Sequence, residues 1–222
     1  MSRTHHLAAL ALFAVAALAL RGQTPVLAQR GFSQVPATDV LAVPDPVAVS
    51  LDASTTAFLA IDLLQSGCAL NPICVATLPA VAAGLAAARA ANALVLESTH
   101  LPPDIEILPD VAPAPGDIVF AAPPGGDKFF NSDLDDILKQ AGIKTLVLTG
   151  QSSNQGVLYT ASAAGQRGIT VVVAEDGISA TTDLATSVAL WQMLNGPRPN
   201  PRNVPLQANS VTLSRTDLIT YK

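Results

Sequence analysis

Three polar side chains and one glycine-containing turn stand where a catalytic site would need them. Asp62 directly follows the apolar segment AFLAI, His100 follows the apolar run that begins at Ala93, and the turn Gly150–Gly156 follows TLVL. An acid placed directly after an apolar segment is costly to bury unless it is paired or used. Lys128, in the segment GGDK, is a natural partner, and a close pair would favour the charged form of both side chains. The pattern indicates an acid–base site, and its simpler alternatives are a helix-capping Asp62 and a solvated Lys128.

The elements that must position these residues are clearest around the turn. Thr145–Leu148 is a short apolar and β-branched segment that predicts a buried strand. Gly156 to about Arg167 predicts a helix of small residues, and Ile169–Ala174 predicts a second buried strand. A strand, a helix and a strand in roughly 30 residues form a right-handed unit with parallel strands. Ligands bind beyond the carboxyl ends of such strands, so the turn is the first candidate for the site.

The alternation of strands and helices continues on both sides of this unit. Further strands are predicted at Ala57–Ile61, Ala93–Glu97, Ile118–Phe120 and Val211–Leu213. Further helices are predicted at about Leu78–Ala91, from Asn131 or Ser132 to Gly142, and at Asp183–Leu194. Such alternation is typical of an α/β fold with a doubly wound parallel sheet.

Length and charge limit the possible functions. The chain has 222 residues, half of them apolar, which suits one domain with a sizeable core. Its formal net charge is −5 and it contains no basic run, so we expect no nucleic-acid partner.

The first 28 residues have the layout of a secretory signal. Arg3 precedes the apolar run Leu7–Leu20, and Val26-Leu27-Ala28 offers small residues for cleavage. The alternative is an uncleaved N-terminal anchor, which Arg21, just after the run, leaves open. We expect cleavage after residue 28, a Pro- and Ala-rich linker or arm over residues 29–50, and a folded domain over residues 51–222. The mature protein would carry a net charge of about −7, would be secreted or periplasmic, and would not contact the membrane.

The two cysteines, Cys68 and Cys74, are six residues apart in SGCALNPICV. In an oxidising compartment this short loop can close as a disulfide, which is the interpretation we favour. A nucleophilic thiolate is the less favoured alternative, because His100 is the only histidine after the signal that could activate one. The same scarcity of ligands predicts no metal and no other cofactor.

Three segments together resemble the isochorismatase-like hydrolases, a family of mostly cysteine hydrolases. They are FLAIDLLQSGC, GDKFFNSDLDDILKQAGIKTLVLTG and TGQSSNQGVLYTASAAGQRGITVVVAEDGISA, and the resemblance covers roughly residues 56–218. It implies a three-layer α/β/α fold with a central, mostly parallel sheet of about six strands. Most members hydrolyse amides with an Asp-Lys-Cys triad, and the resemblance places Asp62 and Lys128 on its first two members.

The third member of that triad is missing, because Gly156 stands at the position of the cysteine. True isochorismatases also carry glycine there, and they hydrolyse a vinyl ether without a covalent intermediate. That chemistry needs one acid of raised pKa and no nucleophile. The resemblance thus implies Asp62 as general acid and base, with Lys128 orienting it or binding a substrate carboxylate.

The resemblance also implies residues that contact the substrate. The backbone N–H of Gly156 could hold a negative oxygen, and the family's cis peptide would fall between Gln151 and Ser152. We expect Gln151 and Ser152 to help bind the substrate and His100 to close the rim of the pocket. Family habit suggests a homo-oligomer.

Departures from the isochorismatases leave three functions open. The tyrosine and histidine usual in the turn are replaced by serine (Ser152 or Ser153) and Asn154, and Leu64 replaces a glutamine. The first possibility is a small-molecule hydrolase that uses Asp62 and Lys128. The second is a catalytically inactive member that binds a small ligand. The third is a hydrolase that uses Ser152 or Ser153 as nucleophile, although no base is identifiable nearby.

Overall fold

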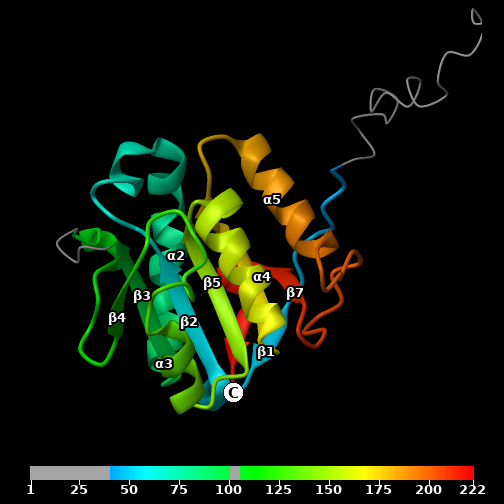
Figure 1. The fold of residues 1–222 in the computed structure, drawn as a ribbon, viewed down its shortest axis with the longest axis horizontal. Helices are drawn as coiled ribbons and strands as arrows, with labels where there is room; N and C mark the ends of the chain where they lie inside the picture. Colours follow the sequence, from blue (N-terminus) through cyan, green and yellow to red (C-terminus); the bar gives the residue numbers. More distant parts are fainter. Residues whose placement is uncertain (1–40, 101–105) are drawn as a thin grey trace, which may run out of the picture. The chain divides into compact units, whose positions relative to one another are not determined.

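The computed structural model describes residues 41–100 and 106–222, so the predicted signal over residues 1–28 lies outside the described residues. The described chain forms a central sheet of six strands, all parallel, in the spatial order β4-β3-β2-β5-β6-β7 (Figure 1). The strands are β2 (Thr56–Ile61), β3 (Leu94–His100), β4 (Ile118–Ala122), β5 (Thr145–Gln151), β6 (Thr170–Ser179) and β7 (Val211–Ser214). This sheet confirms the predicted α/β class and the strand number.

The strand order reverses between β2 and β5. From β2 the chain proceeds outward through β3 to β4, and from β5 it proceeds in the other direction through β6 to β7. The two central strands pair over their whole common length, from Thr56 opposite Thr145 to Ile61 opposite Gly150. Their carboxyl ends therefore flank the topological switch point, which is where ligands bind in open α/β sheets.

Helices cover both faces of the sheet. The helix α2 (Pro72–Ala90) packs on one face, and α3 (Leu134–Gln140), α4 (Leu158–Gln166) and α5 (Asp183–Asn195) pack on the other. Figure 1 shows α4 and α5 crossing the near face of the sheet. Along β2, Leu59 joins the core beneath α3 and α4, whereas Phe58 joins the core beneath α2. This alternation is the period-2 pattern of a strand buried on both faces.

The helix α2 begins six residues before its predicted start near Leu78. Asn71 caps it by accepting a hydrogen bond from the backbone N–H of Ile73 at 3.1 Å, and Pro72 is its first residue. Proline suits that position because its missing N–H would have no partner within the helix. The helix is long and apolar enough to cross a membrane by length and composition alone, yet Leu78 and Leu85 are buried in the core against the sheet.

Two short strands escaped prediction. They are β1 (Val49–Leu51) and β8 (Ile219–Tyr221), which pair with each other in parallel on the α2 side of the fold. The folded domain thus includes residues that the sequence suggested were part of the arm. Ahead of β1, the backbone N–H of Val47 donates to the carbonyl of Leu213 at 3.0 Å, so this part of the arm lies along β7.

The predicted strand, turn and helix around Gly150–Gly156 are present with one local difference. The helix starts with a π-helical turn, Ser153–Val157, before α4 begins at Leu158. Gly150 has a φ of 109°, in the region that favours glycine. A Cβ on Gly150 would lie 2.6 Å from the backbone nitrogen of Ile61 and nearer still to its carbonyl oxygen. Only glycine fits where β5 passes the end of β2.

We predict that Gly150→Ala lowers the free energy of unfolding by about 3 kcal/mol or more, because it combines backbone strain with an overlap that neither strand can relieve. Urea unfolding of the variant and of Gly126→Ala measures the difference. Gly126 is the matched control, since a Cβ there would meet no atom within 4 Å. Equal stability of the two variants would contradict the close approach of β5 to Ile61.

A buried glutamate, Glu97, lies in the middle of β3 and contacts Arg89 of α2. Glu97 is 1% exposed, with Oε1 3.3 Å from an Arg89 guanidinium nitrogen that also contacts Asp117 at 2.6 Å. The second carboxyl oxygen, Oε2, has no hydrogen-bond partner among the described residues. Burial raises the pKa of Glu97 to about 7, although the charge of Arg89 opposes the rise. The folded protein therefore keeps a proton on Glu97 at pH values where the unfolded chain releases it, from about 4.5 upward.

This pKa predicts a loss of stability as the pH rises. The contribution of Glu97 is present below about pH 4.5 and is lost as the pH approaches 7, because the folded state binds the extra proton. Between pH 5 and pH 8 we expect Glu97→Gln to gain about 1–3 kcal/mol in the free energy of unfolding relative to the wild type. Urea unfolding across this range measures the gain, and Glu106→Gln, at an exposed glutamate, should show none. A constant difference between Glu97→Gln and wild type across the range would refute the protonated state.

Candidate functional site

Asp62 lies at the switch point of the sheet, as the first residue after β2. It is 5% exposed, and its φ of 50° places its backbone in the left-handed region. His100 ends β3 and Gln151 ends β5, on the two sides of β2. The topology thus gathers three of the predicted site residues at neighbouring carboxyl ends.

Lys128 reaches this point from the loop between β4 and α3. Its Nζ lies 2.6 Å from Oδ2 of Asp62, and its side chain is fully buried. The same Nζ donates to the carbonyl of Pro123 at 3.2 Å. The backbone N–H of Lys128 donates to Oγ1 of Thr160 on α4 at 3.0 Å, which ties the loop to the helix. The structure therefore contains the Asp–Lys pair that the sequence suggested.

Two residues of β3 complete the surroundings of the carboxylate. Nε2 of His100 lies 3.1 Å from Oδ2 of Asp62, so this histidine contacts the acid directly, beyond its expected place at the rim. The hydroxyl of Ser98 donates to Oδ1 of Asp62 at 2.6 Å and accepts from the Asp62 backbone N–H at 3.0 Å. Sequence reasoning missed Ser98. The feature that could have identified Ser98 is its position two residues before His100, because residues two apart in a strand lie on the same face.

The pKa of Asp62 is lower than the ordinary aspartate value, which contradicts the expected raised value. Burial raises the pKa of Asp62, but the hydrogen bonds from His100, Lys128 and Ser98, together with the charge of Lys128, outweigh it. These donors favour the carboxylate over the acid. The raised value was what the chemistry implied by the resemblance requires, whereas the lowered value agrees with the expectation that a close Asp62–Lys128 pair favours both charged forms. In the resting site Asp62 is a base rather than an acid.

Gly156 lies beside Lys128 in the π-helical turn. A Cβ built on Gly156 would be 3.6 Å from Cε of Lys128 and 3.2 Å from Cγ2 of Ile61. A side chain at this position would thus face the lysine.

Gln151 and Ser152 form the link between β5 and that turn. Their peptide bond is cis, as the resemblance implies. The Gln151 side chain donates to the backbone carbonyl of Asp62 at 3.5 Å, and Ser152 is partly exposed. The neighbouring Ser153 is fully buried, and its hydroxyl donates to Thr186 at 3.1 Å.

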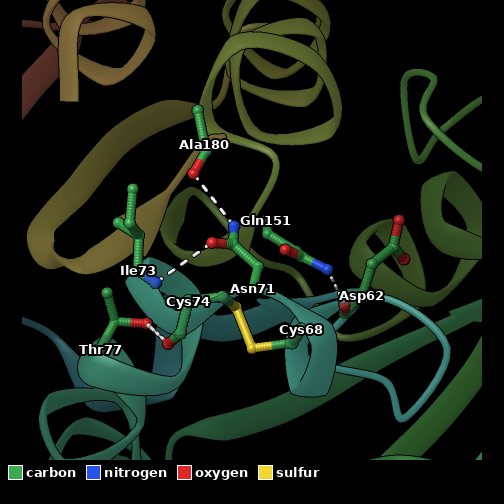
Figure 2. Close-up of a disulfide and its surroundings, with 8 residues drawn as sticks. All are labelled: Asp62, Cys68, Asn71, Ile73, Cys74, Thr77, Gln151 and Ala180. Carbon is green, nitrogen blue, oxygen red and sulfur yellow. Dashed lines mark hydrogen bonds between the residues drawn. A yellow bond between two sulfur atoms is a disulfide. The ribbon is translucent and has the colours of Figure 1, made fainter. Parts of the chain in front are cut away.

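A disulfide borders the site. Cys68 and Cys74 are bonded, which confirms the predicted pairing. Figure 2 shows this loop beside Gln151 as the amide reaches the backbone of Asp62. A Cβ on Gly67 would lie 2.6 Å from Nε2 of Gln151, so the glycine leaves room for the amide. Nδ2 of Asn71 donates to the carbonyl of Ala180 at 3.0 Å, which joins the loop to the segment before α5.

The arrangement can hold and move a proton at one oxygen. Oδ1 of Asp62 is bonded to Ser98, whereas Oδ2 faces both Lys128 and His100. Within residues 41–100 and 106–222, no three His, Cys, Asp or Glu side chains form a group suited to a metal ion. The chemistry that these side chains support is proton transfer beside a buried cation.

Comparison with known proteins gives the family. Residues 56–199 match the isochorismatase domain. YecD of Escherichia coli O157:H7, an uncharacterized isochorismatase family protein, is 44% identical over 54 residues, which cover 24% of this chain and 29% of YecD. The secreted isochorismatase effector Isc1 of Verticillium dahliae is 32% identical over 114 residues, or 46% of this chain and 60% of Isc1. The matched segments thus cover less than two thirds of either relative.

Solved structures agree on the fold. The crystal structure of a cysteine hydrolase from Pseudomonas syringae pv. phaseolicola superimposes with a TM-score of 0.63, at 18% identity, over 78% of this chain and 94% of that one. At this identity the likeness concerns the fold alone. Since the isochorismatase domain matches residues 56–199, which are most of the described chain, the protein belongs to the isochorismatase family.

Proposed function

We propose that this protein is an exported hydrolase of a small molecule that works without a covalent nucleophile. Asp62 is its general acid and base, and Lys128 is the cation that orients the carboxylate or the substrate. The observation that carries the proposal is the 2.6 Å contact between the Asp62 carboxylate and the fully buried Lys128 ammonium. A buried pair of this kind at the switch point is costly to maintain for stability alone.

The resemblance supports a mechanism without cysteine. It aligns Gly156 with the family's nucleophile, and a glycine has no side chain that could attack a substrate. Cys68 and Cys74 are bonded to each other and have no thiolate to offer. Ser153 directs its hydroxyl to Thr186, which argues against a serine nucleophile at that position.

Hydrolysis of a vinyl ether fits these groups. A proton adds to the terminal carbon of the double bond, and water adds to the resulting oxocarbenium carbon. The hemiketal then separates into a ketone and an alcohol. In this scheme Asp62 gives the first proton and takes one back from the attacking water, so the residue is unchanged after each turnover.

Asp62 must acquire a proton before it can give one, because its pKa is lowered in the resting site. A substrate carboxylate that pairs with Lys128 would weaken the interaction that favours ionised Asp62, and exclusion of water would increase the effect of burial. Both changes raise the pKa of Asp62. The proposal therefore favours an anionic substrate, with Gln151, Ser152 and His100 around it and the Gly156 N–H near its oxygen.

Two observations support export. The disulfide Cys68–Cys74 suits an oxidising compartment, and the relative from Verticillium dahliae is a secreted protein. Residues 1–28 are the proposed signal. A homo-oligomer stays a prediction from family habit.

The second candidate function is ligand binding without catalysis. The lowered pKa of Asp62 favours it, because a permanently ionised carboxylate beside Lys128 can bind a ligand without transferring a proton. A ligand that raises the melting temperature and is recovered unchanged would indicate this function.

We predict that Asp62→Asn abolishes turnover, with a loss of 10²-fold or more, because the amide cannot exchange the proton. The measurement is product formation from isochorismate and from a panel of vinyl ethers, esters and amides. Circular dichroism checks the fold, and Asp110→Asn, at an exposed aspartate, is the control that should keep full activity. Residual activity of Asp62→Asn close to the wild-type level would exclude Asp62 as the acid and base.

We also predict that Gly156→Cys creates a reactive thiol, because Lys128 stabilises the thiolate and lowers the thiol pKa below its ordinary value of about 8.5. The rate of alkylation by iodoacetamide between pH 5 and pH 9 reports this pKa, and the wild type has no unpaired cysteine to interfere. Gly126→Cys, with no neighbour within 4 Å of its Cβ, is the control and should titrate normally. An ordinary or raised midpoint for Gly156→Cys would show that position 156 does not face the lysine.

A further inference from the structure

We propose that Ser98 is a positioning residue for the acid–base step: its hydroxyl fixes the conformation of Asp62 and directs Oδ2 to the reacting side of the site. This inference rests on the proposed function, in which Asp62 carries the proton. No contact between Ser98 and a substrate is needed.

The hydroxyl of Ser98 is bonded in both directions to the same residue. It accepts from the Asp62 backbone N–H at 3.0 Å and donates to Asp62 Oδ1 at 2.6 Å. Ser98 is 1% exposed, so water has little access to replace either bond. A single side chain therefore links the backbone and the carboxylate of Asp62.

This link matters because Asp62 has an unusual backbone. Its φ of 50° is uncommon for a residue with a side chain, and such a conformation persists only where its surroundings hold it. The Asp62 carbonyl accepts from the backbone N–H of Leu64 at 3.0 Å and from Gln151 at 3.5 Å. On the other side of the residue, Ser98 restrains the Asp62 backbone by accepting a hydrogen bond from its N–H.

The same link separates the two carboxyl oxygens. Oδ1 is held by Ser98, so the carboxylate cannot rotate freely, and Oδ2 is left to Lys128 at 2.6 Å and His100 at 3.1 Å. Proton transfer at Oδ2 thus occurs beside the buried cation. Without the hydroxyl, the two oxygens could exchange places and the contact with Lys128 would be kept only part of the time.

The test compares Ser98→Ala with Ser98→Thr, which keeps the hydroxyl. In the full chain, ¹³C NMR of the aspartate side-chain carbonyls follows the titration of Asp62, with Asp62→Asn used to assign its signal. We expect Ser98→Ala to raise the Asp62 midpoint by about one pH unit, because a donor to the carboxylate is lost. We expect Ser98→Thr to bring the midpoint back toward the wild-type value. Thr99→Ser, a change at the next residue on the opposite face of the strand, should leave it unchanged.

A substrate found in the panel would extend the test to catalysis. Ser98→Ala should then lower kcat at least tenfold, change KM less than twofold and shift the pH profile in step with the Asp62 midpoint. Ser98→Thr should recover most of the loss. A role in folding alone would lower stability without moving the midpoint or the profile.

An unchanged Asp62 midpoint in folded Ser98→Ala would overturn the inference, whatever the activity of the protein. If Ser98→Ala does not fold, Ser98→Cys carries the same test, because its thiol is of similar size but is a weak donor. Absence of turnover in the wild type would instead count against the proposed hydrolase. The two failures are thus distinguishable.

Discussion

The structure of the site depends on keeping two opposite charges inside the protein. Asp62 and Lys128 are both buried, and burial of either charge alone would be strongly unfavourable. Their contact of 2.6 Å compensates in part, and the remaining donors and acceptors come from Ser98, His100 and the carbonyl of Pro123. Removing one partner would leave the other charge uncompensated. The neighbouring residues therefore supply the hydrogen bonds that the buried Asp62–Lys128 pair needs.

The residues around the Asp62–Lys128 pair come from distant parts of the chain, and the fold brings them together. The reversal of strand order between β2 and β5 leaves the end of β2 accessible from the loops around it. Asp62 comes from β2, Ser98 and His100 from β3, and Lys128 from the loop after β4. Gly67, directly before the disulfide loop, is the glycine against which the Gln151 amide lies.

The resemblance aligns Gly156 with the nucleophilic cysteine of most family members, so the lack of a side chain there bears on the mechanism. A residue larger than glycine at position 156 would face Lys128 and contact Ile61. In the proposed function, glycine at this position leaves the carboxylate and the ammonium in place without a covalent nucleophile. In the proposed function such a site binds an anion and moves a proton, and turnover assays distinguish this from binding alone.

The sequence by itself determined the order and type of most elements. Apolar segments of three to six residues, alternating with helical patterns, predicted the parallel sheet. It also singled out Asp62, because an acid directly after an apolar segment is costly to bury unless it is paired, and the family resemblance singled out Lys128 as its partner. The spacing of Cys68 and Cys74 suggested their pairing. These features are local, and a local pattern is enough to reveal them.

Only the tertiary structure decided the rest. The strands β1 and β8 are three residues long, and their pairing joins the two ends of the domain, so neither carries a signal of its own. Ser98 lies 36 residues from Asp62 in the sequence, and a serine in a predicted strand gives no indication of which side chain it will hydrogen-bond. The direction of the Asp62 pKa shift is a balance between burial and three donors, two from β3 and one from the loop after β4. Such a balance depends on distances in space, which a sequence does not contain.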